Sequence, residues 1–351
     1  MKAYSPGSAI RAENAASRQL PHAGDAAHIR KKRSRRRGPL VASGPDMSDD
    51  FRKHRGWAAR VTAVVFLLAA GSRVAAQTPA QQIDFNRPEA WALKYFSAVS
   101  TFTALGPPVV RAAGSIDFGL ELGWIPSLGE SQRRVGFDGT ALEDLNKSPL
   151  FGRPRLTVGL PFGFSAEAAW VPPVGINGQR ANLVAAALER PFVDAGPLTL
   201  GLRLYGQLGH SKGDFTCSKE VASQPPGSSG NPQSCNAASM DSATLNNGGL
   251  ALTGGVKLGG GGALHFAVGS TYNDMVFQVG AMTGGVPDNT RLATHGWTGW
   301  VAAGAGWPLG KGASFAAEAF YSPLSVVRPP QEMAQNDGLF NVRALLRFHI
   351  R

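Results

Sequence analysis

The chain has 351 residues, enough for one large domain or two ordinary ones. Its formal net charge is +11, but residues 1–76 carry 15 Lys and Arg against 5 Asp and Glu, and the other 275 residues carry 20 against 19. The body of the chain is therefore nearly neutral, which excludes nucleic acid as an electrostatically held partner.

Residues 47–76 have the three parts of a cleavable export signal. Four basic residues form the first part: Arg52, Lys53, Arg55 and Arg60. The uncharged apolar run 61–71 follows, and it is about half of the ~20 residues that a membrane-spanning helix requires. Small residues at 74–76 precede Gln77. We predict cleavage before Gln77 and export of the rest of the chain.

Residues 1–46 lie upstream of this signal. The basic run 30–37 is compatible with a nucleic-acid or nuclear-import patch. Met47, however, would start a signal peptide of ordinary length. We therefore interpret residues 1–46 as a disordered upstream extension.

Residues 77–114 do not alternate like a strand. Pro88 can open a helix, and Trp91, Tyr95, Val99 and Phe102 then share one helical face. The alternative is an eleventh strand. An even number of strands returns both ends of the barrel to the periplasm, and this argues for the helix. We expect a short N-terminal periplasmic segment, helical or irregular.

From residue 115 onward, apolar and polar residues alternate with a period of two, as they do along a strand with one apolar face. The pattern is clearest in three segments: 115–124, 198–208 and 340–350. Seven weaker segments follow the same pattern: 155–160, 164–171, 182–190, 249–258, 263–272, 296–307 and 314–321. Short Gly and Pro turns alternate with long connections, an asymmetry typical of membrane barrels. These features predict an all-β fold, an antiparallel up-and-down transmembrane β-barrel of about ten strands over residues 115–351, with twelve as the alternative.

Aromatic residues lie near the predicted strand ends, where two belts would meet the two membrane interfaces. The predicted girdle consists of Trp124, Trp170, Tyr272, Trp307, Phe315, Tyr321 and Phe348.

The export signal, the alternating strands, the unequal loops and the final strand with Phe348 and Ile350 together resemble the bacterial outer-membrane β-barrel proteins as a class. The resemblance implies a location in the cell outer membrane, with outer-membrane lipid and the barrel assembly machinery as partners.

If the apolar face meets lipid, the polar face lines the lumen. Ten charged residues lie on that face: Asp117, Glu121, Arg155, Glu167, Glu189, Arg203, Lys257, Glu318, Arg343 and Arg347. Five acids and five bases predict a narrow, salt-bridged lumen, because buried charges must be paired. We expect Arg343 and Arg347 to meet Asp117 and Glu121, since the last strand must pair with the first. A narrow polar pore is the alternative.

Two further sets of residues concern the long connections. Cys217 and Cys235 lie in the exported part, where a disulfide is expected rather than a metal site. His210, Ser211 and Asp214 could form a catalytic group, but three such residues in a polar loop also arise by chance. We predict no enzymatic activity, no cofactor and no metal.

The sequence names no substrate, since fold alone does not settle function. The main hypothesis is a structural or surface-loop-presenting barrel. The alternative is a pore or transporter for a small solute, and a secreted β-sandwich binding protein is a distant third.

Overall fold

The computed structural model describes residues 79–350. The predicted upstream extension at 1–46 and the predicted signal peptide at 47–76 lie outside the described residues. Among the helices that are described, none is long and apolar enough to cross a bilayer.

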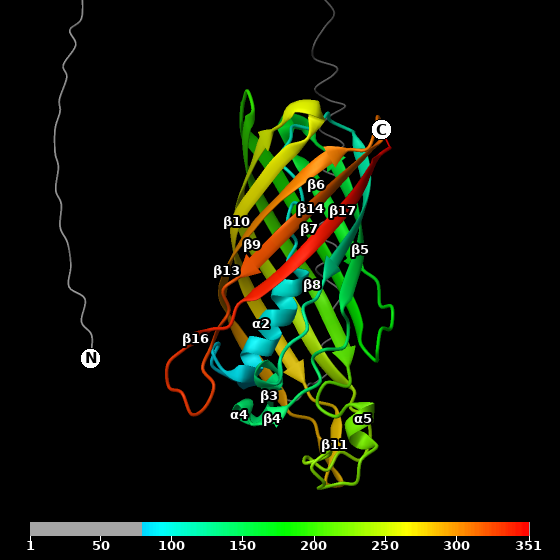
Figure 1. Ribbon diagram of the computed structural model, residues 1–351, viewed down its shortest axis with the longest axis vertical. Coiled ribbons are helices and arrows are strands. Elements are labelled where there is room, and N and C mark those ends of the chain that lie inside the picture. The colour runs from blue at the N-terminus through cyan, green and yellow to red at the C-terminus, as the bar shows by residue number, and fades with distance from the viewer. Residues whose placement is uncertain (1–78, 351) are drawn as a thin grey trace, which may run out of the picture. The chain divides into compact units, whose positions relative to one another are not determined.

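The fold is a closed antiparallel β-barrel in which every strand pairs with its neighbours in sequence (Figure 1). Its strands are β2 (Ile116–Trp124), β5 (Leu150–Gly159), β6 (Ser165–Val171), β7 (Arg180–Ala195), β8 (Leu198–Gly213), β9 (Asp241–Lys257), β10 (Ala263–Gln278), β13 (Arg291–Pro308), β14 (Ala313–Ser322) and β17 (Leu339–His349). Closure comes from β17, which pairs with β14 on one side and with β2 on the other. Each of the ten predicted strand segments is confirmed.

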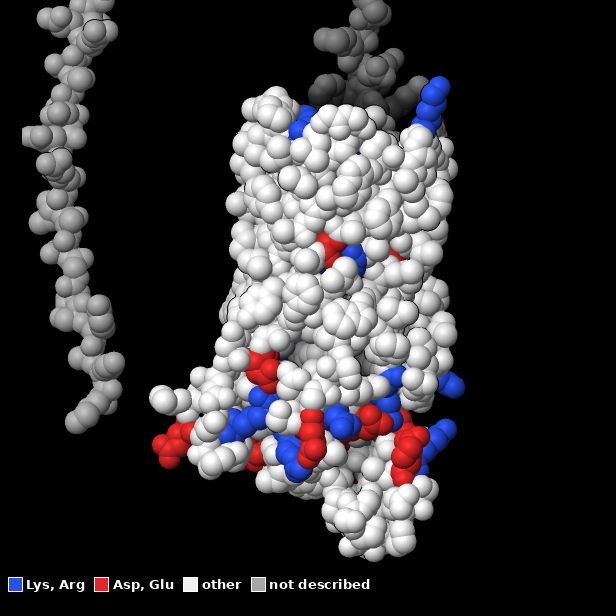
Figure 2. Space-filling model, in the orientation of Figure 1, with Lys and Arg blue, Asp and Glu red and all other residues white. Residues whose placement is uncertain are grey.

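The alternation of apolar and polar residues sets which face of each strand forms the exterior of the barrel. On β2, Phe118 and Leu122 point outward and are exposed, whereas Asp117 and Glu121 point inward and are buried. Successive strand residues face opposite sides, so the whole barrel acquires an apolar exterior. Figure 2 shows this mostly uncharged surface, with charged side chains gathered at the end that carries the long loops.

Several strands run further than predicted at the long-loop end. β9 begins at Asp241 rather than at residue 249, and β10 and β13 also extend beyond their apolar segments. In these extensions both faces of the strand carry polar residues, as in residues 241–247. The hydrophobic alternation therefore ends before the hydrogen-bonded ladder does.

The connections alternate in length as predicted. Tight turns contain the 3-10 helices η1 (Pro161–Gly163) and η2 (Gly259–Gly261), and Gly260 has a positive φ of 73°. The long loops carry small elements of their own: α3 (Glu130–Arg133), β3 (Arg134–Val135), α4 (Gly136–Gly139), β4 (Ala141–Leu142), α5 (Lys219–Ala222), β11 (Ala281–Thr283), β12 (Val286–Asp288), β15 (Ser325–Val326) and β16 (Gln335–Asn336).

The predicted disulfide joins Cys217 and Cys235 in the loop between β8 and β9. Both residues are fully buried, and Val279 and Ala281 of a neighbouring loop pack against them. Closing a loop of this size stabilises the fold by roughly 3 kcal/mol on the chain-entropy model. The disulfide therefore fixes the longest loop into a folded cap.

The helix α2 (Pro88–Ser100) lies inside the barrel (Figure 1). Pro88 is at its first turn, and the predicted face with Trp91, Tyr95 and Val99 is buried. β1 (Gln81–Gln82) pairs in parallel with the first residues of β13, at the long-loop end. The N-terminal segment therefore enters the bore at the long-loop end. Its apolar face is buried there against the barrel wall.

From Ser100 the chain continues through the bore toward the short turns, where β2 begins. Pro107 and Pro108 pass so close to the wall that a Cβ atom on Gly255 or Gly201 would lie 2.4 or 2.7 Å from a proline Cβ. Glycine at these two strand positions makes room for the chain. We call residues 88–108 the plug.

The predicted girdle residues face outward near the strand ends. Trp124, Trp170, Tyr272 and Tyr321 are exposed toward the long loops. Trp307 and Phe348 are exposed toward the short turns, and Phe315 beside them is half-buried. Trp297, opposite Tyr272 in the sheet, extends the belt at the long-loop end.

The outward register of β8 can be tested with a charge. Leu202→Arg should lower the free energy of unfolding by roughly 2–4 kcal/mol, because its side chain points outward at mid-strand. Leu198→Arg, at the turn end of the same face, should cost about 0–1 kcal/mol, since charges near the interface are tolerated. The measurement is a denaturant titration of protein folded into phospholipid vesicles. Equal costs for the two variants would contradict the assigned membrane depth.

Candidate functional site

The interior of the barrel holds a network of buried ion pairs centred on Glu121. Arg153 Nε lies 2.5 Å from Glu121 Oε2, and Arg153 Nη2 lies 3.0 Å from Oε1. Arg155 Nε donates to Oε2 of the same carboxylate at 2.6 Å. The Glu121 side chain is fully buried. Two guanidinium groups therefore supply the hydrogen bonds that a buried carboxylate requires.

The network continues across β5, β6, β7 and β8 through Glu167. Arg155 Nη1 donates to Glu167 Oε1 at 3.1 Å, and Arg203 Nη2 donates to Oε2 at 2.7 Å. Arg203 also lies 3.7 Å from Glu189, whose other oxygen accepts a hydrogen bond from Thr253. Arginines of β5 and β8 thus neutralise the glutamates that β6 and β7 carry between them.

The plug inserts an aromatic ring among these guanidinium groups. Phe102 is fully buried, and its ring centroid lies 4.5 Å from the guanidinium carbon of Arg155 and 4.8 and 4.9 Å from those of Arg153 and Arg203. A cation near an aromatic ring is attracted by the ring quadrupole, more strongly where water is excluded. Thr103 adds a carbonyl that accepts from Arg155 at 3.0 Å.

Arg343 holds the end of the plug helix. Its Nη2 donates to the carbonyls of Ala98 and Val99 at 2.9 and 3.2 Å, and its Nη1 donates to the carbonyl of Thr101. The last carbonyls of a helix have no partner within the helix and carry partial negative charge. The guanidinium group satisfies them.

Arg343 and Arg347 do not form the ion pairs expected with Asp117 and Glu121. Asp117 pairs instead with Arg111 of the plug's continuation and with His349, at 2.7 Å from His349 Nδ1. Arg347 forms no ion pair within residues 79–350. The expectation was wrong for two reasons. Arg153 and Arg155 of β5 already hold Glu121, and the chain inside the bore, which strand pairing does not reveal, supplies partners for Arg343 and Asp117.

Glu318 lies in the bore and accepts a hydrogen bond from Thr103 of the plug at 2.7 Å. His265 Nε2 is 3.6 Å from the same carboxylate. Lys257, by contrast, lies outside the network: its side chain is half-exposed at the short-turn rim and pairs with Asp194 at 2.5 Å. It is the last residue of β9, where the strand already leaves the barrel interior.

Sequence reasoning missed Arg153 and the plug residues Phe102 and Thr103 as parts of this network. The predicted segment begins at residue 155, whereas β5 begins at Leu150 and includes Arg153. Arg153 and Arg155 stand two residues apart, and this spacing alone placed them on one face of β5.

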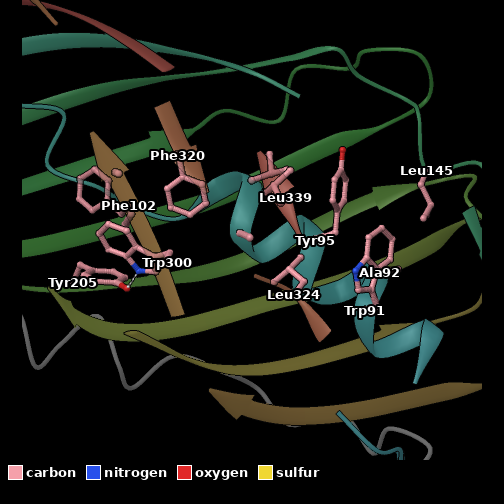
Figure 3. Close-up of a cluster of buried hydrophobic side chains, with 14 of the residues drawn as sticks. Trp91, Ala92, Tyr95, Phe102, Leu145, Tyr205, Trp300, Phe320, Leu324 and Leu339 are labelled. Atoms are coloured by element: carbon pink, nitrogen blue, oxygen red, sulfur yellow. Dashed lines mark hydrogen bonds between the residues drawn. The ribbon is translucent and has the colours of Figure 1, made fainter. Parts of the chain in front are cut away.

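A second group of inward side chains is aromatic. Tyr205, Trp300 and Phe320 project from three strands toward the bore (Figure 3). Trp300 Nε1 donates to the Tyr205 hydroxyl at 2.7 Å, and the Trp300 ring stacks on Phe320 at a centroid distance of 5.6 Å. The plug, the charged residues and these rings together form the protein's core.

Two cavities flank α2 at the long-loop end. The mouth cavity has a volume of about 310 Å³ and lies between α2 and the loops, lined by Leu93, Glu143 and Phe215 among others. The side cavity has a volume of about 250 Å³ and lies between α2 and strands β5 to β7. Phe96 and Leu145 line both cavities and separate them.

His210, Ser211 and Asp214 are not assembled into one group. Ser211 Oγ accepts from Gln179 at 2.9 Å, and Asp214 lies 2.9 Å from the Lys147 ammonium. No hydrogen bond joins His210 to either residue in the part of the chain that the structure describes.

Comparison of the sequence with protein-family models and with curated proteins gives no match. Among solved structures, the chain is similar to Ail, the attachment invasion locus protein of Yersinia pestis, at 10% identity, covering 68% of this chain and 99% of that chain with a TM-score of 0.25. It is similar to the translocator domain of the autotransporter NalP from Neisseria meningitidis at 11% identity, covering 69% and 89% with a TM-score of 0.34. These likenesses concern the fold alone.

A third similar structure is the outer-membrane protease OmpT from Escherichia coli, at 10% identity, covering 68% of this chain and 94% of that chain with a TM-score of 0.27. The prediction that the chain is not an enzyme was wrong. One of these similar structures is a protease, so this type of fold does not exclude an enzyme. The match assigns no activity to this chain.

The loop that carries Glu143 lines the mouth cavity. The buried carboxyl group of Glu143 makes the stability of this loop depend on pH. Burial, and then the negative charge of Asp241, raises the pKa of Glu143 from 4.5 to about 8. The folded loop therefore keeps a proton that the unfolded loop releases between these two values. Stability from this group is complete below about pH 4.5 and is lost as the pH rises toward 8.

We expect amide hydrogen exchange in residues 134–145, corrected for the intrinsic rate, to be faster at about pH 8.5 than at about pH 5.5. Glu143→Gln should remove most of this difference. Glu130→Gln, which changes an exposed carboxyl group of the same loop, is the matched control and should preserve it. Persistence of the difference in Glu143→Gln would show that another group titrates.

Proposed function

The chain has the fold of the bacterial outer-membrane β-barrels, which points to the bacterial outer membrane, and from this premise we propose a structural barrel that presents its long loops at the cell surface. In this proposal the plug and the charge network close the bore. The observation that carries it is the set of hydrogen bonds from Arg343 of the wall to the last carbonyls of α2.

Closure of the bore is supported by the depth of the contacts between the plug and the wall. Ser97 Oγ donates to Asn273 Oδ1 at 2.6 Å, and Gln207 Nε2 donates to Ser100 Oγ at 2.9 Å. Together with the contacts that Phe102 and Thr103 make, these hydrogen bonds connect the plug to strands on all sides of the bore. The interior of an eight-stranded barrel is just filled by its own side chains. A ten-stranded barrel has slightly more room inside, and here the plug occupies that room.

Presentation of the loops is supported by their internal order. The loop between β8 and β9 is held by the disulfide and by Asn231, which donates to the carbonyl of Cys235 at 3.0 Å. Lys147 of another loop pairs with Asp144 at 2.6 Å and with Asp214 at 2.9 Å. Loops that are joined by such contacts form a defined surface rather than a set of flexible segments.

Passage of a small solute is the second candidate function, favoured by the two cavities on either side of α2. Transport along the bore would require α2 to leave its contacts with Arg343. The two functions therefore differ in how firmly the plug is held.

Conductance in a planar lipid bilayer separates them. The wild type should show no stable open channel. Arg343→Ser should raise the fraction of time spent open by about tenfold or more, because losing hydrogen bonds from a charged donor costs about 1.5–3 kcal/mol.

Arg347→Ser is the matched control, since Arg347 is on the same strand but donates no hydrogen bond to the plug. It should remain closed. Steady, ion-selective conductance of the wild type would overturn the structural role and favour solute transport.

We also propose that the chain is exported by cleavage before Gln77, that the barrel assembly machinery inserts it, and that outer-membrane lipid surrounds its apolar exterior. N-terminal sequencing of the protein from outer-membrane fractions should give Gln77 as the first residue. Retention of residues 61–71 in the mature protein would contradict this proposal.

A further inference from the structure

The side cavity lies where the barrel wall is incomplete. Pairing between β5 and β6 ends at Arg155 and Ala169, although β5 continues to Leu150 and remains paired with β2 along that length. Pro154, the next residue of β5, has no amide hydrogen to donate to a ladder. β6 itself stops at Val171. At the long-loop end, therefore, β5 has a neighbour on one side only.

The cavity adjoins this break, and part of its lining is exposed. Three residues line the cavity and are also exposed: Leu150 at 51%, Val174 at 62% and Ile176 at 40%. Leu150 pairs with Trp124, a residue of the aromatic belt at the long-loop end. The opening thus lies at the depth where the hydrocarbon of the outer leaflet gives way to water.

The lining is apolar, and its polar groups are already engaged. Phe96, Val99 and Leu183 contribute hydrocarbon surface from the helix and the wall. Gln179 donates to Ser211 at 2.9 Å, Ser148 donates to the carbonyl of Leu150 at 2.5 Å, and the Ser100 hydroxyl donates to the carbonyl of Phe96 at 3.0 Å. A ligand here would find little to hydrogen-bond with and no charged group to pair with.

We propose that the side cavity binds a small, uncharged, hydrocarbon-rich molecule that enters laterally between β5 and β6 from the outer leaflet. The size fits: an apolar cavity of about 150 Å³ in another protein holds benzene. The 250 Å³ here has room for a two-ring aromatic compound of similar width. The site goes beyond the proposed structural role, since it can be filled while the plug stays in place.

Photolabelling in lipid nanodiscs tests the proposal. The probe is a small uncharged aryl diazirine, and the readout is the label on the tryptic peptide 95–111, which contains Phe96 and Val99 and lies within the bore. The wild type should label this peptide. An excess of naphthalene should suppress that label by about tenfold at saturation, while labelling of lipid-facing strand peptides is unchanged.

Leu183→Trp fills the cavity and should lower the labelling of peptide 95–111 by about tenfold, because overpacking of an apolar site opposes binding. Leu188→Trp, on the lipid face of the same strand, is the matched control and should label like the wild type. If Leu183→Trp fails to fold, Ala181→Phe fills the cavity from the same strand and makes the same prediction.

Three results would overturn the proposal: no label on peptide 95–111 in the wild type, label that naphthalene does not suppress, or equal label in the cavity-filling and control variants. A second probe carries the diazirine at the end of a phospholipid acyl chain. Strong labelling of the peptide by this probe would identify the occupant as a lipid tail rather than a free small molecule. Because none of these results depends on conductance, failure here leaves the closed-bore proposal standing, and the reverse also holds.

Discussion

The structure depends on one electrostatic constraint, the need to neutralise several guanidinium groups inside a narrow bore. Arg153, Arg155, Arg203 and Arg343 are almost completely buried, and Glu121 and Glu167 are the carboxylates that lie closest to them. An unpaired buried charge is too costly for a stable fold. The plug supplies what the carboxylates lack, through its carbonyl oxygens and the face of Phe102.

The plug and the wall therefore stabilise each other. Without the wall, a helix of this length is only marginally stable in water, and its last carbonyls have no partners. Without the plug, Arg343 has no carboxylate within ion-pair distance among the described residues. The glycines at 201 and 255 belong to the same arrangement, because they admit the chain close to the wall where it descends toward the short turns.

The bore is divided by depth. Charges and the aromatic rings of Tyr205 and Trp300 fill its middle, whereas the end nearest the long loops carries the two cavities. Folded loops cover the mouth, and the wall is broken beside β5. The proposed closure of the bore along its axis is in this way compatible with the proposed binding site at its side.

The sequence by itself determined the strands, their order and the face that each turns outward, because alternation with a period of two is a local property of the chain. The disulfide was also predictable, since only two cysteines are present. Only the tertiary structure decided the partners of Arg343 and Asp117, the outward position of Lys257 and the placement of α2 in the bore. The end of the barrel at which α2 lies, and the oxygen atom to which a buried guanidinium group donates, depend on contacts between residues far apart in the chain. Periodicity says which way a side chain points, and not what it meets there.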